Sequence, residues 1–145
     1  MVKYKMFDHT ADIGMEICGR TKKELFVNAA GALFDLLIEL KDKRKAVDRE
    51  IKGRHKTLTI AGADVEDLLI NFLRELLYLF HGKALVAGPI MITECTTKRL
   101  TAHLPVERYN ETKHIMKTEI KAITYHGLRV EKQKASWKAR VIFDV

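Results

Sequence analysis

Residues 118–126 (TEIKAITYH) hold an acid, an amine, a phenol and an imidazole in close succession. In a strand, successive side chains point to opposite faces, which puts Glu119, Lys121 and Tyr125 on one face and His126 on the other. A half-buried antiparallel strand normally has one apolar and one polar face, so chemistry on both faces is unusual. Two interpretations follow: a solvated strand whose charges pair across a sheet, or a strand that contributes to a functional site.

A second group of reactive side chains lies near the two ends of the chain. Asp12 precedes a predicted strand, and Asp144 ends the last predicted strand beside the free carboxylate of Val145. If these strands are neighbours, three carboxyl groups converge at one strand end, and oxygen-only ligands of this kind suit calcium or magnesium. The alternative is that Asp12 caps a turn, while Asp144 and the terminus are simply solvated.

The usual signatures of an enzyme are missing from the sequence. Ser136 is the only serine and has no Gly-x-Ser-x-Gly elbow, and the glycines are scattered singly, without a phosphate-binding loop. The histidines show no zinc-finger spacing. Cys18 and Cys95 lie in apolar, strand-like surroundings and are predicted to be small buried side chains, although the sequence leaves a disulfide open. We therefore expect no catalytic residues and no enzyme activity.

Length and composition are those of one soluble globular domain that spans residues 1–145, because 145 residues with 47% hydrophobic side chains can bury a sizeable core. No apolar run reaches the roughly 18 residues that a membrane span requires. The N-terminal residues MVKYK lack the apolar core of a signal peptide. We expect a cytoplasmic protein that does not contact membranes.

Two segments have the period of amphipathic helices. Thr21 and Glu24 form a capping box for a helix at about 21–40, and Asp64 caps a second helix at about 64–82 that Gly82 is expected to end. Both carry broad apolar faces. The remaining segments alternate like strands, at 4–8, 13–18, 56–60, 84–94, 99–104, 116–126, 128–131 and 136–144. The predicted fold class is α+β, with two main helices packed on a predominantly antiparallel sheet.

The formal net charge of +7 raises the question of nucleic-acid binding. Basic residues gather at 41–56, which reads as a loop over 41–50, and again at Lys132, Lys134, Lys138 and Arg140. The 41–56 stretch contains no aromatic residues on which bases could stack. Its two interpretations are an ordinary solvated surface and a basic RNA-binding module.

Five sequence blocks occur together in a fixed order: DHTADIG, ELFVNAAGALFDLL, DLLINFLRELL, EIKAITYH and WKARVIFDV. In this combination the chain resembles the archease family from about residue 4 to its end. The resemblance implies a small non-enzymatic protein that activates the RtcB-type RNA ligase, which rejoins tRNA halves after intron removal. Archeases promote guanylylation and multiple turnover of that ligase and can broaden its use of nucleotide triphosphates.

The resemblance also implies a metal site. The family's ligands match Asp12 of the HTAD segment and Asp144, with the carboxylate of Val145 as a further donor, and the expected metal is calcium. His9 is left out because an imidazole is an unusual calcium ligand. The expected partner is the ligase itself, with RNA contact indirect or weak. A chaperone-like role toward RNA- or DNA-processing proteins is the alternative within the family.

The sequence departs from the family pattern at one motif. The family-like glycine–glutamate pair that is followed by a histidine appears here as Val106-Glu107 and His114, so a valine replaces the glycine. The departure concerns the shape of this loop and leaves the expected metal ligands unaffected.

Overall fold

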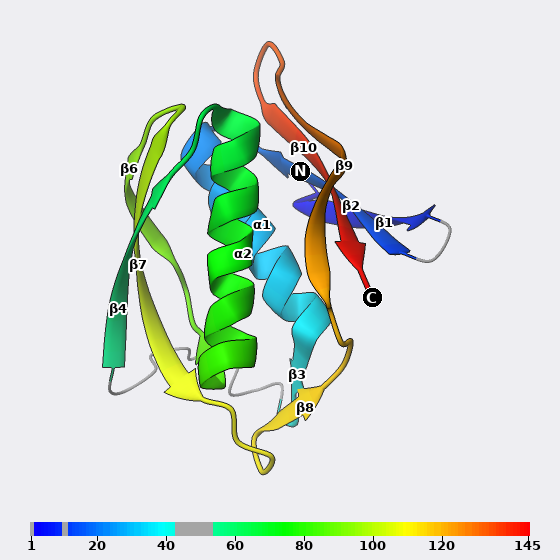
Figure 1. The fold of residues 1–145 in the computed structure, drawn as a ribbon, viewed down its shortest axis with the longest axis vertical. Coiled ribbons are helices and arrows are strands. Elements are labelled where there is room, and N and C mark those ends of the chain that lie inside the picture. Colours follow the sequence, from blue (N-terminus) through cyan, green and yellow to red (C-terminus); the bar gives the residue numbers. More distant parts are fainter. Residues whose placement is uncertain (1, 10–11, 43–53) are drawn as a thin grey trace.

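Two helices lie between two antiparallel sheets in a computed structural model of the chain (Figure 1). The structure describes residues 2–9, 12–42 and 54–145. Most of the predicted 41–50 loop lies outside these residues. The elements follow one another as β1, β2, α1, β3, β4, α2 and then β5 to β10.

Helix α1 (Lys22–Leu37) and helix α2 (Val65–Lys83) begin at the predicted caps. The Thr21 hydroxyl accepts a hydrogen bond from the Glu24 N–H at 3.1 Å, and the Asp64 carboxylate accepts one from the Asp67 N–H at 2.8 Å. Each of these bonds satisfies a backbone donor that the first turn of a helix leaves unpaired.

The first sheet has the strand order β1-β2-β10-β9, and all its pairings are antiparallel. The two terminal segments of the chain therefore meet at its centre, where β2 and β10 are neighbours. Its strands are β1 (Tyr4–His9), β2 (Asp12–Gly19), β10 (Trp137–Asp144) and β9 (Ala122–Lys132).

The second sheet centres on the long strand β7, which pairs with β4 along one edge and with β5 and β6 along the other. A short antiparallel ribbon of β3 and β8 lies at the C-terminal end of α1. These strands are β3 (Ile38–Leu40), β4 (Arg54–Ala61), β5 (Leu85–Ala87), β6 (Met91–Cys95), β7 (Arg99–Arg108) and β8 (His114–Met116).

The core lies where the helices pack against both sheets. Phe26 of α1 and Phe72 of α2 are fully buried with ring centroids 6.0 Å apart, while Met15 and Phe143 approach from the first sheet and Leu100 from the second. Because each helix is covered from two sides, its apolar face is wider than that of a surface helix. This arrangement accounts for the broad stripes in the sequence and confirms the predicted α+β class with two main helices and antiparallel strands.

The first predicted helix is too long by three residues. It ends at Leu37 because Ile38 adopts an extended backbone (φ −140°, ψ 160°) and enters β3. The second helix continues through Gly82, and Ala84 takes the left-handed conformation at its C-terminal cap (φ 53°). The predicted strand at 84–94 is likewise divided into β5 and β6.

The predicted strand at 116–126 is wrong over residues 117–121, which run irregularly between β8 and β9. Backbone groups of this segment bond to three different elements. The Lys117 N–H donates to the Leu37 carbonyl at 2.9 Å, His81 Nε2 donates to the Ile120 carbonyl at 2.8 Å, and the Lys121 N–H donates to the Asp144 carbonyl at 2.7 Å. Within this irregular segment, the side chain of Ile120 is fully buried in the core.

The strand predicted at 128–131 and the end of the 116–126 segment are one continuous strand, β9, interrupted by a bulge opposite Val141. Gly127 (φ 68°) lies in this irregularity. No helix among the described residues has the length and apolar character needed to cross a membrane.

Candidate metal site at the ends of β2 and β10

Asp12 and Asp144 are direct cross-strand partners in the ladder between β2 and β10. Ile13 and Phe143, the neighbouring pair in the ladder, belong to the face that packs on the helices, and Phe143 is fully buried. Because side chains alternate along a strand, Asp12 and Asp144 belong to the opposite, outer face. Directly opposed residues have Cβ atoms about 5 Å apart, so the two side chains are close neighbours at this strand end.

The strand end that carries Asp144 is held on both sides. Asp144 pairs with Ala122 of β9 as well as with Asp12, and its carbonyl accepts the hydrogen bond from Lys121. The half-buried side chain of Val145 packs against the core, so the terminal carboxylate directly follows this anchored position. The strand that begins with Asp12 and the last strand are thus neighbours, which is the condition that the sequence analysis set for convergence of the carboxyl groups.

The donors available here are carboxylate oxygens, which fit a hard cation such as calcium. Like charges directly opposite each other in a sheet are destabilising, and a bound cation would offset this effect. Within the described part of the chain, no three His, Cys, Asp or Glu side chains form a group that could hold a metal. Asp12 and Asp144 would therefore need the Val145 carboxylate and water as further ligands, and calcium binding stays a prediction.

Farther along the same face, charges of opposite sign face each other. Glu16 is the cross-strand partner of both Lys5 and Arg140, and its carboxylate lies 3.0 Å from Lys138 Nζ and 3.7 Å from Lys5 Nζ. The hydrogen bond from Lys138 holds the pKa of Glu16 below its usual value. The negative charge of Glu16 is thus compensated by its neighbours within the sheet.

The reactive side chains of 118–126 do not form one group. The Tyr125 hydroxyl donates a hydrogen bond to the Asp67 carboxylate of α2. This bond raises the pKa of the Tyr125 phenol and lowers the pKa of Asp67. Arg74 lies over the Tyr125 ring at 4.9 Å and donates to the Ile123 carbonyl. These contacts attach β9 to α2, so Tyr125 pairs with a helix, whereas the first interpretation of the segment expected pairing across the sheet.

A buried histidine was not singled out as a site by the sequence analysis. His114 is 1% exposed; its Nδ1 accepts from the Asn110 N–H at 3.0 Å, so Nε2 carries the proton and donates to Glu107 at 3.1 Å. Lys113 Nζ lies 2.9 Å from the other oxygen of Glu107, and the Tyr109 ring stacks on the imidazole. The family-like glutamate and histidine thus fix the shape of the 109–113 loop.

Val106, which replaces the family's glycine, is buried in β7 and pairs with Arg54 and Ala87. A side chain is therefore accommodated at this position by the core. Cys18 and Cys95 are half-buried free thiols, so the disulfide that the sequence left open is not formed.

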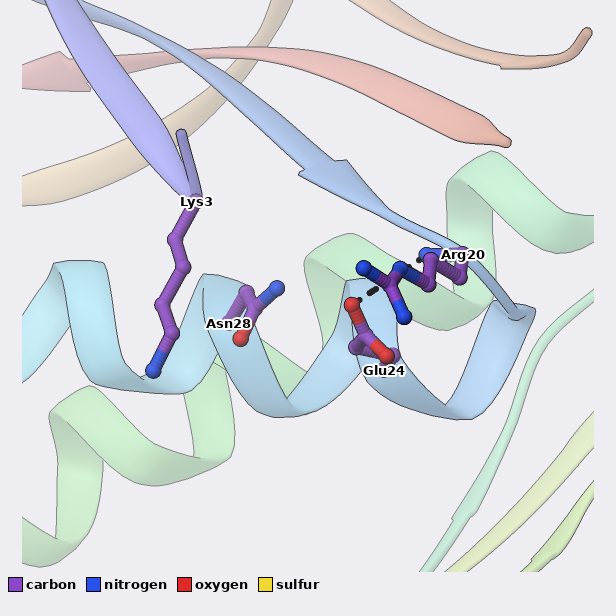
Figure 2. Close-up of a pocket in the computed structure, with 4 residues that line it drawn as sticks. All are labelled: Lys3, Arg20, Glu24 and Asn28. Carbon is purple, nitrogen blue, oxygen red and sulfur yellow. Dashed lines mark hydrogen bonds between the residues drawn. The ribbon is translucent and has the colours of Figure 1, made fainter. Parts of the chain in front are cut away.

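A polar pocket of about 400 Å³ lies on α1, at the opposite end of β2 from Asp12. Figure 2 shows its lining residues Lys3, Arg20, Glu24 and Asn28. The Glu24 carboxylate accepts from the Arg20 N–H, which completes the helix cap, and the Asn28 amide donates to the Cys18 carbonyl at 2.7 Å. Because these contacts attach the first turns of α1 to the end of β2, we assign the pocket a structural role.

The structure is that of an α+β protein in which Asp12 and Asp144 are opposed at the ends of β2 and β10. We call this strand end, together with Val145, the acidic tip. Residues 4–145 match the model of the archease protein family (MTH1598/TM1083). The chain is 35% identical to the protein archease of Methanosarcina mazei, over 99% of this chain and 96% of that one, and 35% identical to that of Pyrococcus furiosus over the whole of both chains. The chain belongs to the archease family.

Two solved structures have the same fold over nearly their full length. The solution structure of Methanobacterium thermoautotrophicum protein 1598 superimposes with a TM-score of 0.74 at 27% identity and covers 99% of both chains. The crystal structure of an archease from Thermotoga maritima, described as a possible chaperone, gives a TM-score of 0.62 at 25% identity, over 97% of this chain and 96% of that one.

Proposed function

We propose that this protein is an accessory activator of an RtcB-type RNA ligase in tRNA splicing, and that it acts through the carboxylates of Asp12, Asp144 and Val145. Family membership over residues 4–145 supports the assignment. The observation that carries the role of the tip is the direct cross-strand pairing of Asp12 with Asp144, since this register gathers acidic oxygens at one corner of the first sheet.

The residues of the tip would act by position and charge. Asp12 and Asp144 present their carboxylates on the face turned away from the helices, where a partner protein has access. A divalent cation bound there, with calcium as the expected ion, would supply concentrated positive charge that repositions phosphate groups. Val145 keeps the terminal carboxylate close to this pair because its side chain is packed against the core.

A multiple-turnover ligation assay tests this function. A cognate RtcB-type ligase is used at a concentration well below that of its RNA substrate. It is incubated with and without the protein, which is present in substoichiometric amounts. We expect turnover only in its presence, and no ligation by the protein alone. Equal product with and without the protein would contradict the proposal.

A C-terminal extension provides a control that leaves the fold intact. Added residues after Val145 convert its carboxylate into a peptide group while Phe143 keeps β10 in register. We expect the extended protein to bind calcium more weakly and to stimulate the ligase less than the native chain. Unchanged stimulation would remove the terminal carboxylate from the proposed site.

A chaperone-like modulator of RNA- or DNA-processing proteins is the second candidate, favoured by the description of the Thermotoga maritima relative as a possible chaperone. Aggregation of unrelated client proteins, measured by light scattering on heating, separates the two functions. Suppression of aggregation without any effect on the ligase would favour the chaperone role.

A further inference from the structure

The outer face of the first sheet carries two rows of charged residues beyond the acidic tip. Cross-strand pairing aligns Lys5, Glu16, Arg140 and Arg129 in one row that crosses all four strands. In the adjacent row Lys138 faces Glu131 of β9. We call Lys5, Arg129, Lys138 and Arg140 the basic rows. These four cations outnumber the two carboxylates in the same rows, those of Glu16 and Glu131.

Arg129 and Arg140 are direct cross-strand partners at the centre of this surface. Like charges in this arrangement are destabilising, so the pair marks a place where an anion would be favourable. The side chain of Arg129 is 72% exposed, and its guanidinium lies 3.7 Å from the carboxylate of Glu131. Two guanidinium groups on one face can each bind a phosphate with two parallel hydrogen bonds.

The Arg140 side chain is held in place before any ligand binds. Its guanidinium lies 4.0 Å from the centre of the Phe7 ring, which in turn covers Gly14 so closely that a Cβ atom there would be 2.1 Å from the ring. A cation stacked on an aromatic face loses less conformational freedom on binding than a free side chain. Phe7 and Gly14 thereby position Arg140.

At the far end of β10, the aromatic Trp137 belongs to the opposite face of the sheet from Lys138, because side chains alternate along the strand and Trp137 packs against the core. Trp137 is partly exposed, and the ammonium groups of Lys22 and Lys132 lie 5.8 Å and 5.9 Å from its ring centroid. The aromatic ring on the outer face is that of Phe7, which pairs with Gly14 and carries the Arg140 guanidinium. A basic surface that includes an aromatic side chain is typical of proteins that bind single-stranded nucleic acid. The 41–56 stretch lacks this feature in the sequence.

We propose that this outer face binds the sugar–phosphate backbone of single-stranded RNA, with Arg129 and Arg140 as paired phosphate ligands. The choice of RNA rests on the proposed function. A strand lying along β10 would extend for about 23 Å from Trp137 toward Asp144. The tip itself repels phosphate, so the RNA would end beside the carboxylates that face the ligase.

The test measures binding of a short labelled single-stranded RNA to the full-length protein by fluorescence anisotropy over a salt series, with no ligase present. We expect the double variant Arg129→Gln, Arg140→Gln to bind several-fold more weakly. Its slope of log affinity against log salt should fall by about 1.4, because each phosphate contact on a single strand contributes about 0.7. Arg129→Lys, Arg140→Lys should restore most of that slope, since it keeps both charges.

The matched control is Arg54→Gln, Lys56→Gln on β4 of the second sheet, which lowers the net charge equally and should leave the slope near its wild-type value. Equal losses in both double variants would overturn the proposal, because binding would then follow net charge alone. Absence of RNA binding by the wild type would also overturn it, as would tighter binding of polyglutamate than of RNA.

A parallel measurement keeps this proposal separate from the proposed function. Guanylylation of the ligase is assayed with nucleotide and metal but without RNA, and we expect the Arg129→Gln, Arg140→Gln variant to stimulate it like the wild type. Loss of guanylylation in this variant would mean that the face contacts the ligase, which would overturn its assignment to RNA.

Discussion

The same ladder of β2 and β10 handles charge differently at its middle and at its end. In the middle, Glu16 faces Arg140 and bonds to Lys138. At the end, Asp12 faces Asp144, so the cross-strand partner has the same sign. Opposed charges of unlike sign stabilise a sheet, whereas like charges cost free energy that an external cation would offset. The carboxylate in the middle is therefore compensated within the sheet, whereas the pair at the end is suited to a cation.

The largest effect is expected from a substitution that disturbs the register of β10, which both regions share. Phe143 is fully buried, and it pairs with Ile13 of β2 and with Ile123 of β9. We expect Phe143→Ala to lower the free energy of unfolding by about 3–5 kcal/mol, because it leaves a cavity in the core. Chemical denaturation measures this, and a loss below about 1 kcal/mol would show that Phe143 does not hold the register.

A direct comparison of the two regions uses isosteric amide variants. Asp12→Asn and Asp144→Asn should each weaken calcium binding at least tenfold in calorimetry, since even outer-shell changes cost about 10–100-fold. Glu16→Gln is the matched control on the same strand and face, and should leave the affinity unchanged. Equal affinities for all variants would sink the metal assignment.

A substitution in α1, far from the acidic tip in sequence, is expected to change the free energy of unfolding by a smaller amount and to leave calcium binding unchanged. Gly31 lies on the exposed side of α1, and a Cβ atom there would meet nothing within 4 Å. Gly31→Ala should raise the free energy of unfolding by about 0.5–1 kcal/mol, because alanine loses less backbone entropy in a helix. Calcium affinity should not change. A less stable variant would indicate that α1 is packed differently.

The smallest effect is the pH dependence of the compensated middle. The pKa of Glu16 is lowered in the folded protein, so its contribution to stability is present above about pH 4.5 and is lost as the pH falls through the folded pKa. Denaturation at about pH 7 and about pH 3 should therefore show a difference between wild type and Glu16→Gln that shrinks at the lower pH. A difference independent of pH would mean that packing, and not charge, is responsible.

Local signals predicted the helices well because each signal acts within a few residues. Thr21 and Asp64 cap their helices as expected, since a side chain that satisfies a helix N–H lies next to it in sequence. The irregular 117–121 segment could not be predicted, because its hydrogen bonds go to Leu37, His81 and Asp144. Alternation in the sequence carries no information about such distant partners.

In the candidate site, too, the residue types could be predicted from local sequence, whereas the contacts between distant segments could not. The types of Asp12 and Asp144 were informative, yet their meeting depends on β2 and β10 being neighbours, which the sequence stated only as a condition. Arg129 and Arg140 could not be paired from sequence, because a bulge in β9 shifts the register between them and the strand end. Tertiary pairing, and not local pattern, determines both surfaces.

Guanylylation of a cognate RtcB-type ligase, followed with labelled nucleotide in the absence of RNA, tests the central claim most directly. We expect the wild type and Glu16→Gln to stimulate the reaction alike, and Asp12→Asn and Asp144→Asn to lose most of the stimulation while remaining folded by circular dichroism. Full stimulation by both aspartate variants would contradict the account, because the acidic tip would then have no part in activating the ligase.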